Sequence, residues 1–458
     1  MLTLVRADAA FLDGRLQRDV TLGIENGHVV TVPPDAPKTD VIDLKGKLLL
    51  PGFVNGHSHA FQRAIRGRTE FLAPGHERDD FWTWRDAMYA AANALDPDSL
   101  YAVSKQAFLE MALAGVTAVG EFHYLHHQVD GAAYADEGLL AHQVVRAARD
   151  VGLRICLLRV GYQRAGFQVD PNPKQRRFLD ADVDVYLRRS FALRDALEGD
   201  ELVSFGLAPH SVRAVPRRWL EVIAQETKGT SIPIHMHVAE QPGEIRACMT
   251  EYGARPVELI DATGLLNENF TAVHAVHLDR WEVGRLGTMR CTICACPSTE
   301  RNLGDGIVEA DSLIHAGARI SLGSDSHAHI DLLAEAQMLE GHLRLLRLRR
   351  NVLDPATGGA SAQAVRLLDA LSHAGSRSLG LAPATLAPGS PADFVAVDLT
   401  HPSMLGARDL LTSAVFAASS GAVKDVFVAG KPIVREGRHE QTAHIASAFS
   451  SAVAELRW

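Results

Sequence analysis

The chain has 458 residues, 47% of them hydrophobic and 22% charged, which is ordinary for a globular protein of one large and one small domain, or of two to three domains. Its net charge is −9 without any basic block, which argues against a nucleic-acid partner. Five cysteines are too few and too scattered for a disulfide framework. Because neither an export signal nor a long apolar run is present, we expect a cytoplasmic protein with no membrane partner.

Residues 1–50 contain short strand-like runs that are separated by turn signals. The Asn26-Gly27 pair stands between two alternating apolar runs and is a strong hairpin signal. This part of the chain is therefore predicted to be a small antiparallel β unit. The apolar run Leu48–Leu50 follows and reads as a short buried strand, which we take as the first strand of the next domain.

From residue 51 to 385, amphipathic helices alternate with short β-branched strands. A cap and a first-turn proline at Asp96-Pro97 predict a helix that runs to about Ala114. Counted from the Leu48 run, the expected strands lie near residues 48–50, 116–122, 153–160, 202–208, 231–238, 270–274, 291–295 and 319–323. Eight parallel strands of this kind close into a (β/α)8 TIM-type barrel with its working face at the strand C-termini.

The β pattern returns near the C-terminus, in the runs GSPADFVAVDL and VFVAGKPIV. We expect residues 386–445 to join residues 1–50 in one β-sandwich that is assembled from both ends of the chain. The remaining residues, 446–458, are predicted to form a C-terminal helix. The domain organisation is thus a composite β-sandwich and a catalytic barrel over residues 51–385.

Polar residues fall at the ends of the predicted barrel strands. His57 and His59 lie two residues apart, and side chains at i and i+2 of a strand point to the same side, so both can reach one metal ion. His237 ends the fifth strand, and Asp325 follows the eighth. Three neutral nitrogens and one carboxylate suit a divalent metal such as zinc, with a position left for water. The metal would lower the pKa of that water from about 15.7 to about 7.

Two more titratable groups occupy the same end of the barrel. Glu240 ends the fifth strand region, and His274 ends the sixth strand. One of them would protonate the leaving nitrogen, and the other would hold and polarise a substituent of the reacting carbon. Asp325 can touch both metal and water, so it could accept the proton.

These motifs resemble those of the amidohydrolase superfamily. The matching runs are PGFVNGHSH, HVAE, AVHAVHL and GSDSH, and the two C-terminal runs resemble the sandwich of that superfamily. Some branches carry two metals bridged by a modified lysine at the end of strand four. The run LRICLLRVGYQR, taken as strand four, has no lysine within residues 151–170, which indicates the one-metal deaminase branch. A homodimer is a common arrangement in the superfamily and is expected here.

Within that branch, the chain is most similar to the formimidoylglutamate deiminases of histidine degradation. The resemblance rests on the runs HSHAFQRAIRGR, FWTWRDAMY, EFHYLHH, APHSVRAV, HVAEQ and CPSTERNLGDG. It implies hydrolysis of N-formimidoyl-L-glutamate to N-formyl-L-glutamate and ammonia. It also implies that Gln62, Tyr124, His210 and Arg213 contact the substrate.

Charge gives independent support for a small acidic substrate. A glutamate derivative carries two carboxylates, and a chain of net charge −9 needs fixed cations to hold it. Arg213 lies just past strand four or five and can make bidentate, charge-assisted contacts, with Arg66, Arg68 and Arg85 as further candidates. Two alternatives remain: a deaminase of a cyclic amidine such as guanine, which would need aromatic stacking and few arginines, and a non-catalytic scaffold that has lost its metal.

Several histidines compete with the chosen residues. His235 shares a face with His237, but only His237 fits the HxxE spacing of the superfamily. His277 is a rival to His274, whose position at the strand end we prefer. His327, close to Asp325, could orient that carboxylate.

Overall fold

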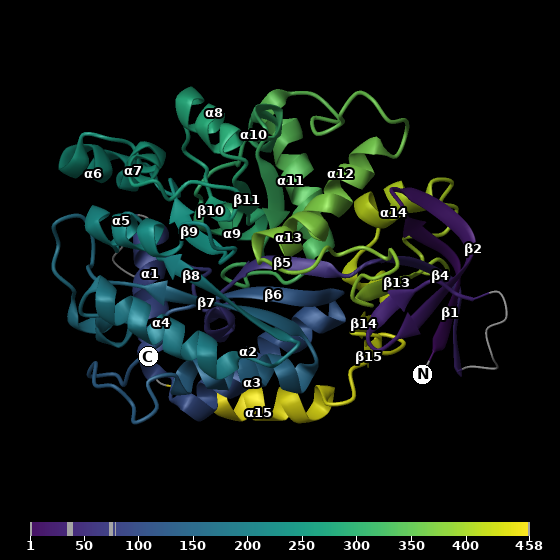
Figure 1. Cartoon of the computed structure of the whole chain (residues 1–458), viewed down its shortest axis with the longest axis horizontal. Coiled ribbons are helices and arrows are strands. Elements are labelled where there is room, and N and C mark those ends of the chain that lie inside the picture. Colours follow the sequence, from purple (N-terminus) through teal and green to yellow (C-terminus); the bar gives the residue numbers. More distant parts are fainter. Residues whose placement is uncertain (1, 34–39, 73–76, 78, 457–458) are drawn as a thin grey trace.

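The protein is described by a computed structural model that covers residues 2–33, 40–72, 77 and 79–456. Eight parallel strands form one sheet and confirm the predicted (β/α)8 TIM-type barrel (Figure 1). In sheet order from the first to the eighth, they are β5 (Phe53–Ser58), β6 (Val116–His123), β7 (Arg154–Gly161), β8 (Val203–Pro209), β9 (Ile234–Val238), β10 (Phe270–His274), β11 (Thr292–Ala295) and β12 (Arg319–Leu322).

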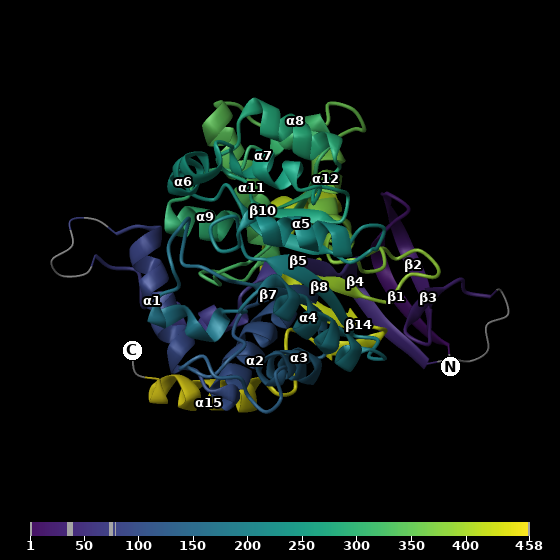
Figure 2. The same ribbon diagram turned by 60° about the vertical axis from the view of Figure 1, so that its left-hand side comes forward.

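Helices connect these strands and surround the barrel (Figures 1 and 2). The helices that alternate with the strands, as predicted, are α2 (Pro97–Leu113), α3 (Leu139–Val151), α4 (Val183–Leu197), α5 (Arg217–Glu226), α7 (Pro256–Ala262), α8 (Arg280–Thr288) and α10 (Ala310–Ala316). Asp96 caps α2 as predicted, because its side chain accepts a hydrogen bond from the Ser99 N–H. Short segments after the strand ends add η1 (Ala60–Ile65), η2 (Pro173–Phe178), α6 (Pro242–Tyr252) and α9 (Pro297–Leu303), and α1 (Phe81–Ala94) precedes α2.

The first barrel strand is β5, and the prediction that it contains Leu48–Leu50 was wrong. These leucines lie in β4 (Asp40–Pro51), which pairs with β1 (Thr3–Leu12) and β13 (Phe394–Asp398) in the other sheet. Gly52 separates β4 from β5, and a Cβ at this position would lie only 2.2 Å from Thr117 Oγ1. A run of three leucines fits any buried strand, so the sequence does not show to which sheet it belongs.

The second sheet combines strands from both ends of the chain, as predicted. Its order is β15-β14-β13-β4-β1-β2-β3, with β2 (Arg15–Glu25), β3 (His28–Val30), β14 (Val423–Val428) and β15 (Lys431–Val434). The hairpin turn between β2 and β3 has positive φ at Asn26 (50°) and Gly27 (78°), as the Asn-Gly signal predicts. In the apolar core of this sheet, the rings of Phe394 and Phe427 stack with centroids 4.3 Å apart.

The position of LRICLLRVGYQR in the barrel differs from the predicted one. LRICLLRVGYQR forms β7, which is the third barrel strand and not the fourth. The fourth strand is β8, with the sequence VSFGLAP, and it also contains no lysine. The fourth strand therefore offers no lysine that could bridge two metal ions.

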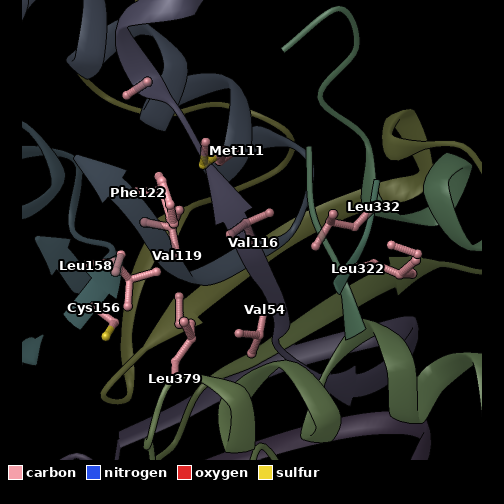
Figure 3. Packing of buried hydrophobic residues seen from close by; sticks show 14 of the residues in the cluster. Val54, Met111, Val116, Val119, Phe122, Cys156, Leu158, Leu322, Leu332 and Leu379 are labelled. Atoms are coloured by element: carbon pink, nitrogen blue, oxygen red, sulfur yellow. The ribbon is translucent and has the colours of Figure 1, made fainter. Parts of the chain in front are cut away.

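The barrel floor is closed by helices that follow β12. This region contains α11 (Leu332–Arg347), α12 (Ala362–Leu371), α13 (His373–Ser378), α14 (Leu410–Phe416) and η3 (Ser420–Ala422). Figure 3 shows Leu379, next to α13, among buried side chains that include Val54 of β5 and Val119 of β6. Since apolar packing fills the floor, the polar residues of the barrel gather at its other end.

The C-terminal helix α15 (Thr442–Glu455) begins at Thr442 instead of residue 446 and lies against α2 (Figure 1). Its Ile445 is buried, and the Arg63 guanidinium lies 5.0 Å from the centroid of the Phe449 ring. No helix in the described part of the chain is long and apolar enough to cross a membrane.

Candidate metal centre and active site

Four predicted ligands converge at the C-terminal end of the barrel. His57 Nε2 lies 3.2 Å from His59 Nε2 and 3.1 Å from His237 Nε2. Asp325 Oδ1 is 3.2 Å from the Nε2 atoms of both His57 and His59. All four residues are buried, and their ligand atoms lie within 4.8 Å of one another, which is a suitable arrangement for one metal ion.

The backbone fixes which ring nitrogens face the centre. His59 Nδ1 lies 3.0 Å from the Phe122 carbonyl oxygen, and His237 Nδ1 lies 3.2 Å from that of His210. An N–H must donate to each carbonyl, so the two Nε2 atoms carry lone pairs that point inward. Burial lowers the pKa of His57 to about 3, so its ring is also neutral. Convergent lone pairs beside a carboxylate are the environment that a divalent cation satisfies.

His57 and His59 face the same centre with Ser58 between them, which is the alternation that the i, i+2 spacing predicts. His57 lies on β5, but His59 lies just past the strand and precedes η1, with φ −124° and ψ 81°. Ser58 points away from the centre, and its hydroxyl donates a hydrogen bond to Glu121 Oε2 at 2.5 Å. The second imidazole therefore follows the alternation of β5 by one residue beyond the end of the strand.

The same residues join the first and last barrel strands. The His59 N–H donates to the Asp325 carbonyl oxygen (3.1 Å), and the Asp325 N–H donates to that of His57 (3.0 Å). This isolated parallel bridge pairs Ser58 with Asp325. Gly323 permits the close approach, because a Cβ there would lie 2.9 Å from the His57 Cβ. Asp325 itself has a φ of 44°, a strained value of the kind that clusters at functional sites.

Glu240 and His274 lie beside the cluster. His274 Nε2 is 3.9 Å from Glu240 Oε1 and 3.8 Å from Asp325 Oδ2, while its Nδ1 is 3.3 Å from Glu300 Oε1. Burial alone would lower the pKa of His274, but the hydrogen bond to Glu300 and the charges of Glu240 and Asp325 raise it well above 6.5. His274 is therefore a cationic hydrogen-bond donor in this arrangement.

Two carboxylates that support the site were missed by sequence reasoning. Glu300, on α9, also accepts the Cys296 N–H at 2.8 Å. Glu121, on β6, accepts hydrogen bonds from the Ser58 hydroxyl and the Ala60 N–H, on either side of His59. Both lie in runs that carried the family resemblance, CPSTERNLGDG and EFHYLHH, but only the fold shows which groups they hold.

A cavity opens onto the cluster, and the four predicted substrate contacts line it. Gln62 Nε2 donates to the Tyr124 hydroxyl at 3.0 Å. The His210 ring lies between those of Tyr162 and His237, at centroid distances of 4.7 and 4.8 Å. The cavity is lined by His59, Gln62, Phe81, Trp84, Arg85, Met88, Tyr89, Tyr124, Tyr162, His210, Arg213, His237, Glu240, His274, Leu303 and Asp325.

Arg213 lies on the loop that follows β8 and is already paired with acids of the chain. Its Nη2 donates to Glu240 Oε2 at 3.0 Å, and its Nε lies 3.5 Å from Glu244 Oε2. Arg66, by contrast, bonds to Glu110 and to the His327 carbonyl oxygen, and neither Arg66 nor Arg68 is among the described cavity residues. The structure thus places only Arg213 and Arg85 of the candidate arginines at the cavity.

The rival histidines lie elsewhere. His235 Nε2 is 2.8 Å from the Ser378 carbonyl oxygen, one layer deeper in the barrel than His237. His277 does not belong to the ligand cluster of the described residues. His327 lies 3.1 Å from Ser58 Oγ and 3.0 Å from Ser324 Oγ, so it contacts the neighbours of two ligands instead of the Asp325 carboxylate.

Comparison with known proteins agrees with this geometry. Residues 48–433 match the Amidohydrolase family. The chain belongs to the amidohydrolase family. A formimidoylglutamate deiminase of Pseudomonas aeruginosa is 37% identical over 99% of this chain and 100% of its own length. Members of this family are metal-dependent hydrolases, and this chain is a hydrolase that acts on carbon–nitrogen bonds.

Solved structures of amidohydrolases share the whole fold. An amidohydrolase from Brucella melitensis superimposes with a TM-score of 0.90 at 33% identity, covering 99% of both chains. An adenosine deaminase from Xanthomonas campestris with bound zinc has a TM-score of 0.82, covering 99% of this chain and 98% of its own. Its identity is 22%, so this second likeness concerns the fold alone.

Proposed function

We propose that the chain hydrolyses N-formimidoyl-L-glutamate to N-formyl-L-glutamate and ammonia, in histidine degradation, with one zinc ion. The observation that carries this proposal is a single cavity that joins the four-ligand cluster to Arg213. The cluster suits hydrolysis, and the arginine suits a carboxylate. The full-length similarity to a formimidoylglutamate deiminase supports the same substrate.

His57, His59, His237 and Asp325 would hold the metal. When bound, the metal supplies Lewis-acid chemistry that makes water a nucleophile near neutral pH. The outer-shell contacts to the Nδ1 atoms of His59 and His237 keep the ligand nitrogens aimed inward. His59 and His237 would thus each present Nε2 to the metal, because their Nδ1–H groups are bonded to backbone carbonyl oxygens.

The acid–base groups follow from the hydrogen bonds. Asp325 accepts the proton of the attacking water, since its Oδ2 faces His274 and not the histidine ligands. The His274 imidazolium, held through Nδ1 by Glu300, donates from Nε2 toward the oxygen that is added to the carbon. The two protons of the water pass by way of Asp325 and Glu240 to the leaving nitrogen, and Glu240 is the group that delivers them. The carbon gains one oxygen from water, its terminal C–N bond breaks, and ammonia leaves.

The substrate contacts have complementary chemistry. Gln62 Oε1 is buried without a partner among the described residues and can accept an N–H of the substrate. Tyr124, His210 and Arg213 supply a hydroxyl, a ring nitrogen and a guanidinium for substrate oxygens. These donors suit a small, polar, acidic molecule.

The proposal is tested by ammonia release from zinc-loaded protein across a panel of substrates. We expect turnover of N-formimidoyl-L-glutamate and none of guanine or adenosine. A zinc-replete protein that ignores the formimidoyl compound but deaminates a ring amidine would contradict the proposal and favour the cyclic alternative. A matched Asp325→Asn preparation measures background release.

A further inference from the structure

A second group of potential metal ligands lies next to the proposed zinc site. It consists of His274 at the end of β10 and of Cys296 and Glu300 at the start of α9. All three residues are buried, and their ligand atoms lie within 4.8 Å of one another. None of them belongs to the four proposed zinc ligands, so the group offers a nitrogen, a sulfur and an oxygen of its own.

The distances in this group are near those around a bound ion. His274 Nδ1 lies 3.3 Å from Glu300 Oε1. With bonds of about 2.0–2.3 Å to zinc, neighbouring ligand atoms of a tetrahedral site are about 3.3–3.8 Å apart. The nitrogen and the oxygen therefore already have the required separation, and a side-chain movement of about 1 Å would bring in Cys296 Sγ.

The Cys296 thiol loses little by binding a metal. Its sulfur lies 3.9 Å from the Cys294 carbonyl oxygen, and a thiol is a weak hydrogen-bond donor. The thiol also lies close to the first barrel strand, because a Cβ on Gly323 would be 3.0 Å from Cys296 Sγ and 2.9 Å from the His57 Cβ. Cys296 thus presents a weakly bonded sulfur atom beside the reaction centre.

Charge does not oppose a cation in this group, although metal ligands must be deprotonated. A divalent ion would displace the thiol proton of Cys296 and the Nδ1 proton of His274, and both protons would pass to solvent. Two positive charges enter and two leave, so the buried group keeps its net charge and avoids the large cost of an unpaired buried charge. Glu300 would exchange the ring N–H for the metal as its partner.

The cavity gives an ion a route to this group, because His274 lines it. The Nε2 of this ring faces Glu240 and Asp325, whereas its Nδ1 faces Glu300. An ion on Nδ1 would break the hydrogen bond between His274 and Glu300 and remove the positive charge of the ring. His274 would then polarise the added oxygen less, so kcat would fall more than KM changes.

We propose that His274, Cys296 and Glu300 form a second, inhibitory site for a thiophilic divalent ion such as zinc or cadmium. A thiolate ligand selects such ions over magnesium and manganese, which prefer oxygen ligands. The binding of the ion stands on the geometry of the three side chains, and its inhibitory effect rests on the proposed function.

Binding is tested by titrating the metal-free protein with cobalt(II), which shows a thiolate-to-metal charge-transfer band when a cysteine is a ligand. The first equivalent should give no such band, because the four proposed zinc ligands contain no sulfur. Excess cobalt should give the band in wild type and in the control Cys156→Ser, a buried cysteine of β7, but not in Cys296→Ser. A wild type without the band, a band that is complete at the first equivalent, or a band that persists in Cys296→Ser would overturn the second site.

Inhibition is tested by ammonia release from N-formimidoyl-L-glutamate, with one equivalent of zinc bound and increasing free zinc. We expect kcat of wild type and Cys156→Ser to fall in excess zinc but not in the same concentration of magnesium. Cys296→Ser should need at least roughly 10-fold more zinc for the same inhibition, since even outer-shell changes weaken metal binding about 10- to 100-fold. Equal inhibition of wild type and Cys296→Ser would overturn the inhibitory role.

Failure of this inference and failure of the proposed function give different results. A wild-type protein that releases no ammonia with one equivalent of zinc overturns the proposed function, and the cobalt titration still tests the second site. If Cys296→Ser does not fold, Cys296→Ala takes its place. The titration of wild type also decides by itself, because the absence of a charge-transfer band in excess cobalt excludes a cysteine ligand.

Discussion

Glu121 should make the stability of the metal-free protein depend on pH. This carboxyl is buried on β6, and burial raises its pKa from 4.5 to about 7, although the hydrogen bonds from Ser58 and Ala60 oppose the shift. Because the folded pKa lies above the unfolded one, the stability that Glu121 contributes is complete below about pH 4.5. It is lost as the pH rises through 7.

The magnitude follows from the two pKa values. Between about pH 5 and pH 8, the ionisation of Glu121 should cost the folded state about 2–3 kcal/mol. In Glu121→Gln the side chain does not ionise, so this cost disappears. The free energy of unfolding of Glu121→Gln minus that of wild type should therefore be about 2–3 kcal/mol larger at the higher pH than at the lower one.

The assay is urea unfolding of both proteins at the two pH values in excess chelator, so that metal binding does not contribute. Other titrating groups are common to both chains and cancel in the difference. Glu226→Gln, at an exposed position at the end of α5, serves as the control and should show the same difference at both pH values. The reasoning would be refuted if the difference in unfolding free energy between Glu121→Gln and wild type were the same at both pH values. It would also be refuted if the variant lost stability relative to wild type as the pH rises.

Three further predictions concern the site and its support. Asp325→Asn should weaken zinc binding by more than the roughly 10- to 100-fold that outer-shell changes cause, as measured by chelator competition, and near-wild-type zinc content would contradict the ligand role. Glu300→Gln should lower kcat roughly 10- to 100-fold at unchanged zinc content by removing the charged partner of His274, and unaltered kcat would refute this. Lys47→Met should remove one of the two cations beside the buried Asp425 charge, leaving Arg435, and cost about 1–3 kcal/mol in urea unfolding without changing KM, so a shifted KM would argue against a purely structural role.

The fold was largely predictable because its signals are periodic and local. Alternating helices and strands, the Asp96-Pro97 cap and the Asn26-Gly27 turn each depend on neighbours in sequence. The sequence could not show which of the two sheets contains Leu48–Leu50, since a run of buried leucines fits either sheet. Gly52 stands between β4 and β5, where a Cβ would lie 2.2 Å from Thr117 Oγ1.

The residues of the candidate site could be selected from sequence motifs, but the contacts between them could not be predicted. His57, His59, His237 and Asp325 come together because parallel strands end at one edge of the barrel. The support from Glu121 and Glu300 depends on contacts between segments far apart in the chain, for which sequence spacing gives no signal.

The backbone bridge between Ser58 and Asp325 has a mechanical consequence. The barrel is closed there by two hydrogen bonds between segments from opposite ends of the (β/α)8 domain, and three of the four proposed ligands, His57, His59 and Asp325, lie at this junction. An ion bound by both segments would add a further link between β5 and β12, where the barrel closes. Chelation should therefore speed amide hydrogen exchange first along β5 and β12, while β7 and β8, which carry none of the proposed ligands, stay protected.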